Sequence, residues 1–113
     1  MSNEIHDHII EILRLAWDTL DADLIEPLLA ADLHYYSWWA LVEFHCKEDY
    51  LSYIRERFQT YKESGKRPIV KIGVNKNDGE YAVALQFGED VPTLIRIKET
   101  AGKITEMWIQ PAE

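Results

Sequence analysis

The spacing of apolar residues changes once along this chain, and that change limits the folds that the chain can adopt. In the first half, apolar side chains recur every three or four residues, as in Ile9, Leu13 and Trp17, which is the spacing of one helical face. In the second half they alternate, as in Val83 and Leu85, which is typical of a strand with one buried face. Helices followed by consecutive strands predict an α+β fold with an antiparallel sheet.

The same patterns place the individual elements. Helices are predicted over residues 4–20 and 47–64, and a short helix is predicted from about Ile25 to Ala31, because Pro27 is tolerated only in a first turn. The predicted strands cover residues 33–39, 41–45, 69–75, 81–87, 93–98 and 103–110. Asn77-Asp78-Gly79 predicts a hairpin turn between two of them.

Length and charge exclude several classes of protein. The 113 residues suffice for one domain, expected to span residues 1–113, and no apolar run reaches the roughly 20 residues that cross a bilayer. Twenty acidic residues against 12 basic ones give a formal charge of −8, which disfavours nucleic acid and anionic membrane surfaces as partners. Cys46 is the one cysteine and cannot form an internal disulfide, so we expect a cytoplasmic protein.

The acidic residues are concentrated at the start of the chain. Residues 1–32 hold eight acidic residues and one basic residue. The later residues are charge-balanced and form mostly strands with bulky apolar faces. We therefore expect a helical layer that keeps the protein in solution and a sheet face that is free to pair.

Three segments resemble the nuclear-transport-factor-two-like superfamily, which includes ketosteroid isomerases and the SnoaL-like polyketide cyclases. They are Ile25–Trp38, Cys46–Arg55 and Gly102–Ile109. The resemblance implies a cone, in which a curved antiparallel sheet wraps around three N-terminal helices. It also implies a pocket between sheet and helices, and a homodimer joined through the outer face of the sheet. Members usually have Gly where this chain has Cys46, so the resemblance predicts either a different turn there or a thiol near the pocket rim.

The resemblance and the residue types together predict two surfaces. The expected pocket lining is aromatic with a few polar contacts, and comprises Trp17, Tyr35, Ser37, Trp39, Tyr53, Arg57, Phe58 and Met107. The expected dimer patch lies on the opposite sheet face and comprises Tyr36, Trp38, Ala82, Ala84, Gln86 and Trp108.

The catalytic groups of the superfamily are only partly matched. Ser37 stands where isomerase-like members carry a carboxylate base, and we expect Asp32 to cap backbone N–H groups at a helix-to-strand junction. His34 or His45 is the best substitute for the missing base. The epoxide-hydrolase-like reaction needs an Arg between two Asp residues on neighbouring strands, and the later predicted strands carry no Asp. We expect Arg96 to pair with Glu106, with an anionic group of a ligand as the alternative partner.

Neither a metal nor an organic cofactor is expected. His34, His45 and Cys46 are spaced like no zinc-binding pattern, and His6 and His8 lie two residues apart on a helix and so face different directions.

Three functional hypotheses remain open from the sequence. The first is a homodimeric domain that binds a small, mostly apolar molecule in the cone. The second is a cofactor-independent lyase, isomerase or hydrolase of the polyketide-cyclase-like branch. The third is a protein-interaction module that uses its acidic helical face.

Overall fold

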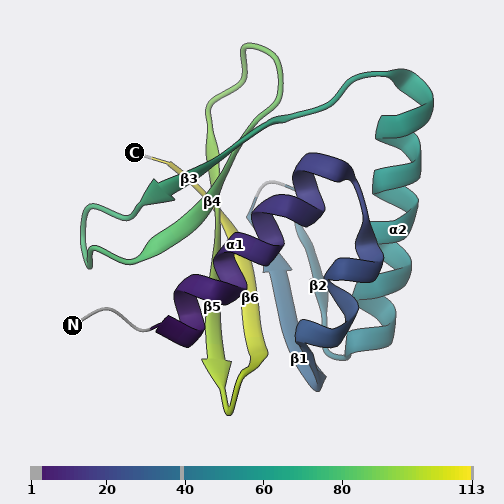
Figure 1. Ribbon diagram of the computed structural model, residues 1–113. Coiled ribbons are helices and arrows are strands. Elements are labelled where there is room, and N and C mark those ends of the chain that lie inside the picture. Colours follow the sequence, from purple (N-terminus) through teal and green to yellow (C-terminus); the bar gives the residue numbers. More distant parts are fainter. Residues whose placement is uncertain (1–3, 39, 113) are drawn as a thin grey trace.

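Two helices pack on one face of a six-stranded sheet in the computed structural model, which describes residues 4–38 and 40–112 (Figure 1). The helices are α1 (Glu4–Thr19) and α2 (Lys47–Ser64). The strands are β1 (Leu29–Ser37), β2 (Val42–Phe44), β3 (Ile69–Val74), β4 (Tyr81–Gln86), β5 (Thr93–Thr100) and β6 (Lys103–Pro111). Their order across the sheet is β2-β1-β6-β5-β4-β3.

The α+β prediction is confirmed, with one difference in strand direction. Four neighbouring strand pairs are antiparallel, but β1 runs parallel to β6, with Tyr35 opposite Met107. The chain reaches β6 from β2 only after α2 and three further strands, which is a connection long enough for a parallel pair. Apolar alternation does not report strand direction, so the sequence predicted an antiparallel sheet throughout.

The short second helix is the element that the sequence predicted wrongly. Residues 22–24 and 26–28 form two 3₁₀ turns, and β1 already begins at Leu29. Pro27 lies in the second turn and has no N–H to continue a helix. Leu29 instead pairs with Ile104 of β6, so pairing within the sheet overrides the helix propensity of residues 28–31.

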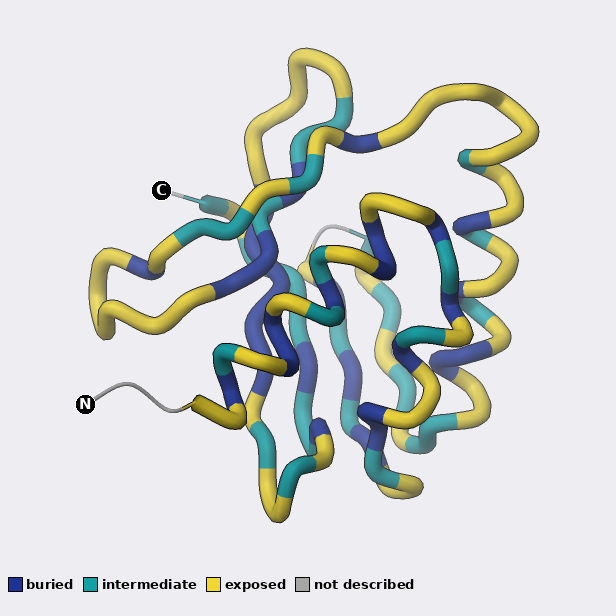
Figure 2. The backbone as a smooth tube through the Cα atoms, in the orientation of Figure 1, coloured by how far each residue is buried: buried dark blue, intermediate teal, exposed yellow. Residues whose placement is uncertain are grey.

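The core lies between the helices and the sheet, where buried segments of both layers face each other (Figure 2). On α1 the predicted apolar face is buried from Ile9 onward, whereas Ile5, in the first turn of the helix, is exposed. On α2 the buried residues are Tyr50, Leu51, Ile54 and Phe58. None of the described helices is long and apolar enough to cross a membrane.

Helix α2 begins and ends at the predicted residues. Gly65 has a φ of 71° at its C-terminal end and donates its N–H to the carbonyl of Tyr61, as expected of a left-handed C-cap. Cys46 is the N-cap, in extended backbone that any residue can adopt. The half-buried Cys46 is not among the described residues that line the cleft, so the structure does not support the expected thiol at the pocket rim.

Candidate ligand-binding cleft

A narrow cleft opens between the helices and the inner face of the sheet. Its described lining residues come from both helices, four strands and two connecting loops, and comprise Trp17, Tyr35, Ser37, Ala40, Tyr53, Ile54, Arg57, Leu85, Phe87, Val91, Thr93 and Ile109. The free space inside is about 20 Å³, which is room for about one water molecule. A larger ligand therefore requires side chains at the mouth to move.

Trp17 forms the aromatic wall on the α1 side. Its ring meets Phe58 edge-on, with 4.8 Å between ring centroids and 80° between planes, and its side chain is almost fully buried. The indole Nε1 is buried without a hydrogen-bond partner among the described residues. A buried N–H donor without an acceptor costs on the order of 1–3 kcal/mol, so this atom is an anomaly that a bound acceptor would resolve.

Three hydroxyl groups also belong to the cleft lining. The hydroxyl of Tyr35, on β1, interacts with those of Ser37 and Tyr53. Burial, as the largest cause, raises the pKa of Tyr35 and also that of Tyr53. Both phenols therefore stay protonated at neutral pH and can donate a hydrogen bond to a ligand. Ser37 Oγ also accepts the N–H of Ala40 at 3.0 Å, which holds the loop after β1.

Arg57 places a positive charge at this end of the cleft. Its guanidinium carbon lies 5.7 Å from the ring centre of Tyr53 and 5.4 Å from that of Tyr61, and it donates a hydrogen bond to the Tyr61 hydroxyl. These contacts fix an otherwise flexible side chain beside the phenols. None of the described lining residues is Asp, Glu or His, so donors and apolar groups dominate the cleft.

The structure sorts the predicted lining residues into three groups. Trp17, Tyr35, Ser37, Tyr53 and Arg57 line the cleft as predicted. Phe58 and Met107 are buried but are not in the described lining, because Phe58 packs behind Trp17 and Met107 lies in the sheet opposite Ile97. Trp39 falls outside the described residues.

Several lining residues were not predicted. Leu85, Phe87 and Ile109 belong to faces whose alternation was visible in the sequence, but only the strand order places those faces at the cleft. Val91 and Thr93 come from the turn before β5 and from its first residue. A turn prediction says nothing of where the turn lies in space, so no sequence signal identified them.

The substitutes considered for a catalytic base lie away from the cleft. Asp32 is exposed in the middle of β1, so the expected capping role at a helix-to-strand junction was wrong. His34 lies on the outer sheet face and contacts Glu43, and His45 follows β2 on the same side. The histidines therefore do not reach the hydroxyls of Tyr35 and Ser37.

Arg96 also differs from its prediction. It is buried on the outer sheet face and binds Asp78 at 2.5 Å and Glu80 at 3.1 Å, both from the β3–β4 hairpin. Glu106 lies opposite Lys98 instead, so the expected Arg96–Glu106 pair was wrong. Residue spacing along the chain could not show that Asp78 and Glu80 of this hairpin reach Arg96 on β5.

The predicted dimer patch is mostly on one face of the sheet. The rings of Tyr36 and Trp108 stack with 9° between planes, and Trp38 meets Tyr36 edge-on while remaining 63% exposed. Ala84 and Gln86 are half-buried on β4. Ala82, in contrast, is fully buried within this chain and has no surface to offer a partner.

No protein-family model and no curated protein matches the sequence, but solved structures share its fold. An NTF2-like protein of unknown function from Mesorhizobium loti superposes with a TM-score of 0.75 at 11% identity, covering 97% of this chain and 93% of that chain. A SnoaL-like protein of unknown function from Burkholderia thailandensis gives 0.72 at 14% identity, covering 100% and 99%. An LEH-like epoxide hydrolase from M. tuberculosis gives 0.65 at 19% identity, covering 94% and 81%. The chain therefore has the NTF2-like fold, as its sequence predicted.

Proposed function

We propose that this chain, with its NTF2-like fold, binds a small molecule that has an apolar body and a hydrogen-bond-accepting group. The observation that carries the proposal is the buried, unpartnered Nε1 of Trp17 in the cleft lining, among the described residues. An acceptor placed against it would supply the hydrogen bond that this N–H lacks among the described residues.

The neighbouring groups support the same chemistry. Protonated phenols at Tyr35 and Tyr53 and the guanidinium of Arg57 are further donors. Donors combined with a positive charge favour a carboxylate or a polarised carbonyl over an amine. The small free volume favours a single ring or a short acyl chain, seated after the mouth widens.

Binding fits the cleft better than acid–base catalysis does. A general base must reach the proton that it removes, within about 3 Å or through one water molecule. The described lining has no carboxylate or imidazole, and His34 and His45 lie on the other sheet face. We further propose that the protein is a homodimer joined through that outer face, supported by the exposed Trp38 and the Tyr36–Trp108 stack.

Three fragments test the binding proposal: benzoate, benzamide and toluene, titrated at millimolar concentration into ¹⁵N-labelled protein. Trp17→Phe identifies the indole N–H resonance of Trp17. We expect benzoate and benzamide to move that resonance, toluene to move it far less, and the exposed Trp38 indole to stay unchanged. One lost hydrogen bond predicts about tenfold weaker benzoate binding in Trp17→Phe.

Arg57→Met is the second variant, in case Trp17→Phe does not fold. It should weaken the charged benzoate more than the neutral benzamide. The proposal is overturned if none of the fragments moves the Trp17 resonance, or if toluene binds as well as benzoate and neither variant changes affinity.

A further inference from the structure

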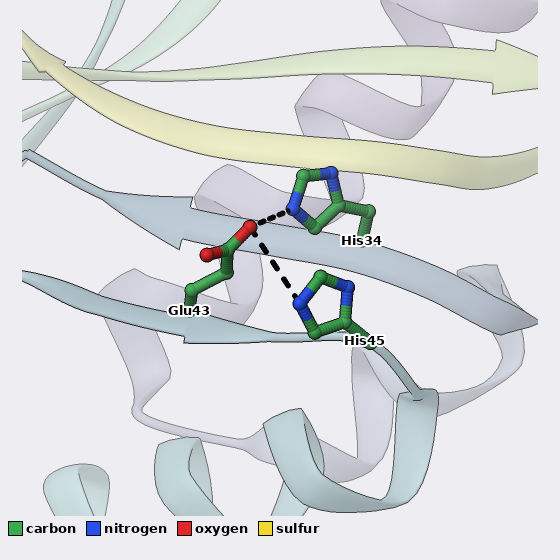
Figure 3. Close-up of side chains that lie close together, drawn as sticks. All are labelled: His34, Glu43 and His45. Carbon is green, nitrogen blue, oxygen red and sulfur yellow. Dashed lines mark hydrogen bonds and ion pairs between the residues drawn. The ribbon is translucent and has the colours of Figure 1, made fainter.

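Two histidines and one carboxylate converge on the outer face of the sheet (Figure 3). His34 Nε2 lies 2.5 Å from Glu43 Oε2, and His45 Nε2 lies 3.6 Å from the same oxygen. The two imidazole rings stack, with 4.9 Å between centroids and 7° between planes. One ligand atom from each residue lies within 4.8 Å of the others.

The pairing of β1 with β2 explains why these residues meet. Tyr36 is opposite Glu43 and Tyr35 is opposite Phe44, so His34 comes next to His45 across the strands. Residues two apart on a strand share a face, which places Glu43 and His45 together on the side away from Ser37. The cluster is therefore separate from the proposed ligand-binding cleft.

The three side chains have the donor types of a transition-metal site. Imidazole nitrogen and carboxylate oxygen bind Zn²⁺ at about 2.0–2.2 Å, so ligand atoms of one tetrahedral ion lie roughly 3.3 Å apart. The His45–Glu43 separation is already close to that value. The His34–Glu43 hydrogen bond would open by somewhat less than 1 Å as an ion took its place.

We propose that His34, Glu43 and His45 bind a divalent transition-metal ion, with Zn²⁺ as the first candidate, on the outer face of the sheet. The stacked rings present both Nε2 atoms to one carboxylate oxygen, and His34 Nε2–H donates a hydrogen bond to it. An ion bound between them would take the place of the Nε2 protons and leave the remaining proton of each ring on Nδ1. His34, Glu43 and His45 are 38%, 53% and 76% exposed, so solvent completes the coordination. Glu106, opposite His34 on β6, adds negative charge nearby.

The sequence does not favour Cys46 beside His34 and His45 as a metal-binding group, because the spacing of these residues matches no zinc-binding pattern. The structure replaces Cys46 with Glu43, because Cys46 caps α2 while Glu43 shares a strand face with His45. Glu43 on β2, His45 directly after that strand and His34 on the neighbouring β1 meet across the strand pair, a pattern that has no zinc-motif spacing along the chain.

Zn²⁺ binding to the full chain is measured by competition with a chromogenic chelator, and Co²⁺ binding by its visible absorption. We expect one ion per chain in each case. His34→Asn, His45→Asn and Glu43→Gln should each weaken Zn²⁺ binding at least about tenfold, since even residues that only support metal ligands contribute that much. The control is His8→Asn, because His8 is exposed on α1 and should leave binding unchanged.

A second readout separates metal binding from damage to the fold. Zn²⁺ should raise the thermal midpoint of the wild-type chain and of His8→Asn, but not that of the three cluster variants. The proposal is overturned if the wild-type chain binds no stoichiometric Zn²⁺, if the cluster variants bind it as well as the wild type, or if His8→Asn lowers affinity equally.

Discussion

Trp17 and Tyr35 show how single core residues can carry a polar atom into the cleft. Both are almost fully buried aromatic residues, as is common in a protein core. Each nevertheless carries a polar atom into the cleft: an indole N–H without a partner among the described residues, and a phenol held by neighbouring hydroxyls. If the cleft binds a ligand as proposed, these polar atoms would select it, while the rings stabilise the fold.

The burial of Tyr35 predicts how stability depends on alkaline pH. Its folded-state pKa is raised, so the folded chain keeps a proton that the unfolded chain loses above about pH 10. Stability is therefore unaffected by this group below pH 10 and falls as pH rises further. Tyr35→Phe removes this effect and should make the decline shallower by up to about 1.4 kcal/mol per pH unit.

Urea denaturation between pH 8 and 11.5 measures that decline. Tyr81→Phe is the matched control, because Tyr81 is exposed at the start of β4. Equal pH dependence in Tyr35→Phe and the wild-type chain would contradict the prediction.

At the scale of elements, helix α2 is defined by its two ends. Gly65 supplies the left-handed backbone that stops it, and the acidic Glu48 and Asp49 lie in its first turn, where the helix dipole favours negative charge. Its N-cap is less well suited, because Cys46 makes no side-chain hydrogen bond to the first turn. A residue that caps the first turn of α2 should therefore increase the stability of the protein.

Cys46→Ser should stabilise the protein by about 0.5–1 kcal/mol, because a serine Oγ can accept a free N–H in the first turn. The extended backbone at this position already suits a serine cap. Chemical denaturation measures the change, with Cys46→Ala as the control that removes the thiol without adding a cap. A similar gain in both variants would show that the thiol, and not the cap, matters.

The whole molecule separates its charges from its aromatic surface. Seven of the eight acidic residues of the first 32 positions lie in or next to α1 and the 3₁₀ turns, and the eighth, Asp32, lies in β1. Trp38, Tyr36 and Trp108 lie on the side of the sheet opposite the helices. This asymmetry favours association through the outer sheet face, where no large excess of negative charge opposes it.

Trp38→Arg tests that association. Sedimentation velocity at about 100 μM should show a dimer for the wild-type chain and a monomer for the variant, because an arginine in an apolar contact is costly to desolvate. Trp38 is exposed, so the fold should be unaffected. Leu15→Arg, at an exposed position of α1, should remain a dimer. A monomeric wild-type chain, or a dimeric Trp38→Arg variant, would contradict the interface.

Local patterns were enough to predict most elements. The period of apolar residues and the cap at Gly65 predicted both long helices and the six strands, although β1 begins earlier than predicted. These elements depend on residues close together in the chain, whose preferences are expressed before any distant contact forms. The cleft residues Trp17, Tyr35 and Tyr53 were instead expected from the resemblance to the NTF2-like superfamily.

Only the tertiary structure decided which distant residues meet. Leu29 pairs with β6 although its local sequence pattern is helical. Asp78 of the β3–β4 hairpin contacts Arg96 of β5. The β1–β2 register places His34, Glu43 and His45 together. The sequence alone determined the elements and their buried faces, because periodicity and capping are local. The strand order, the parallel direction of β1 and β6, and the two proposed sites depend on contacts between residues that are far apart in the chain. The packing of the whole sheet determines which of these contacts form.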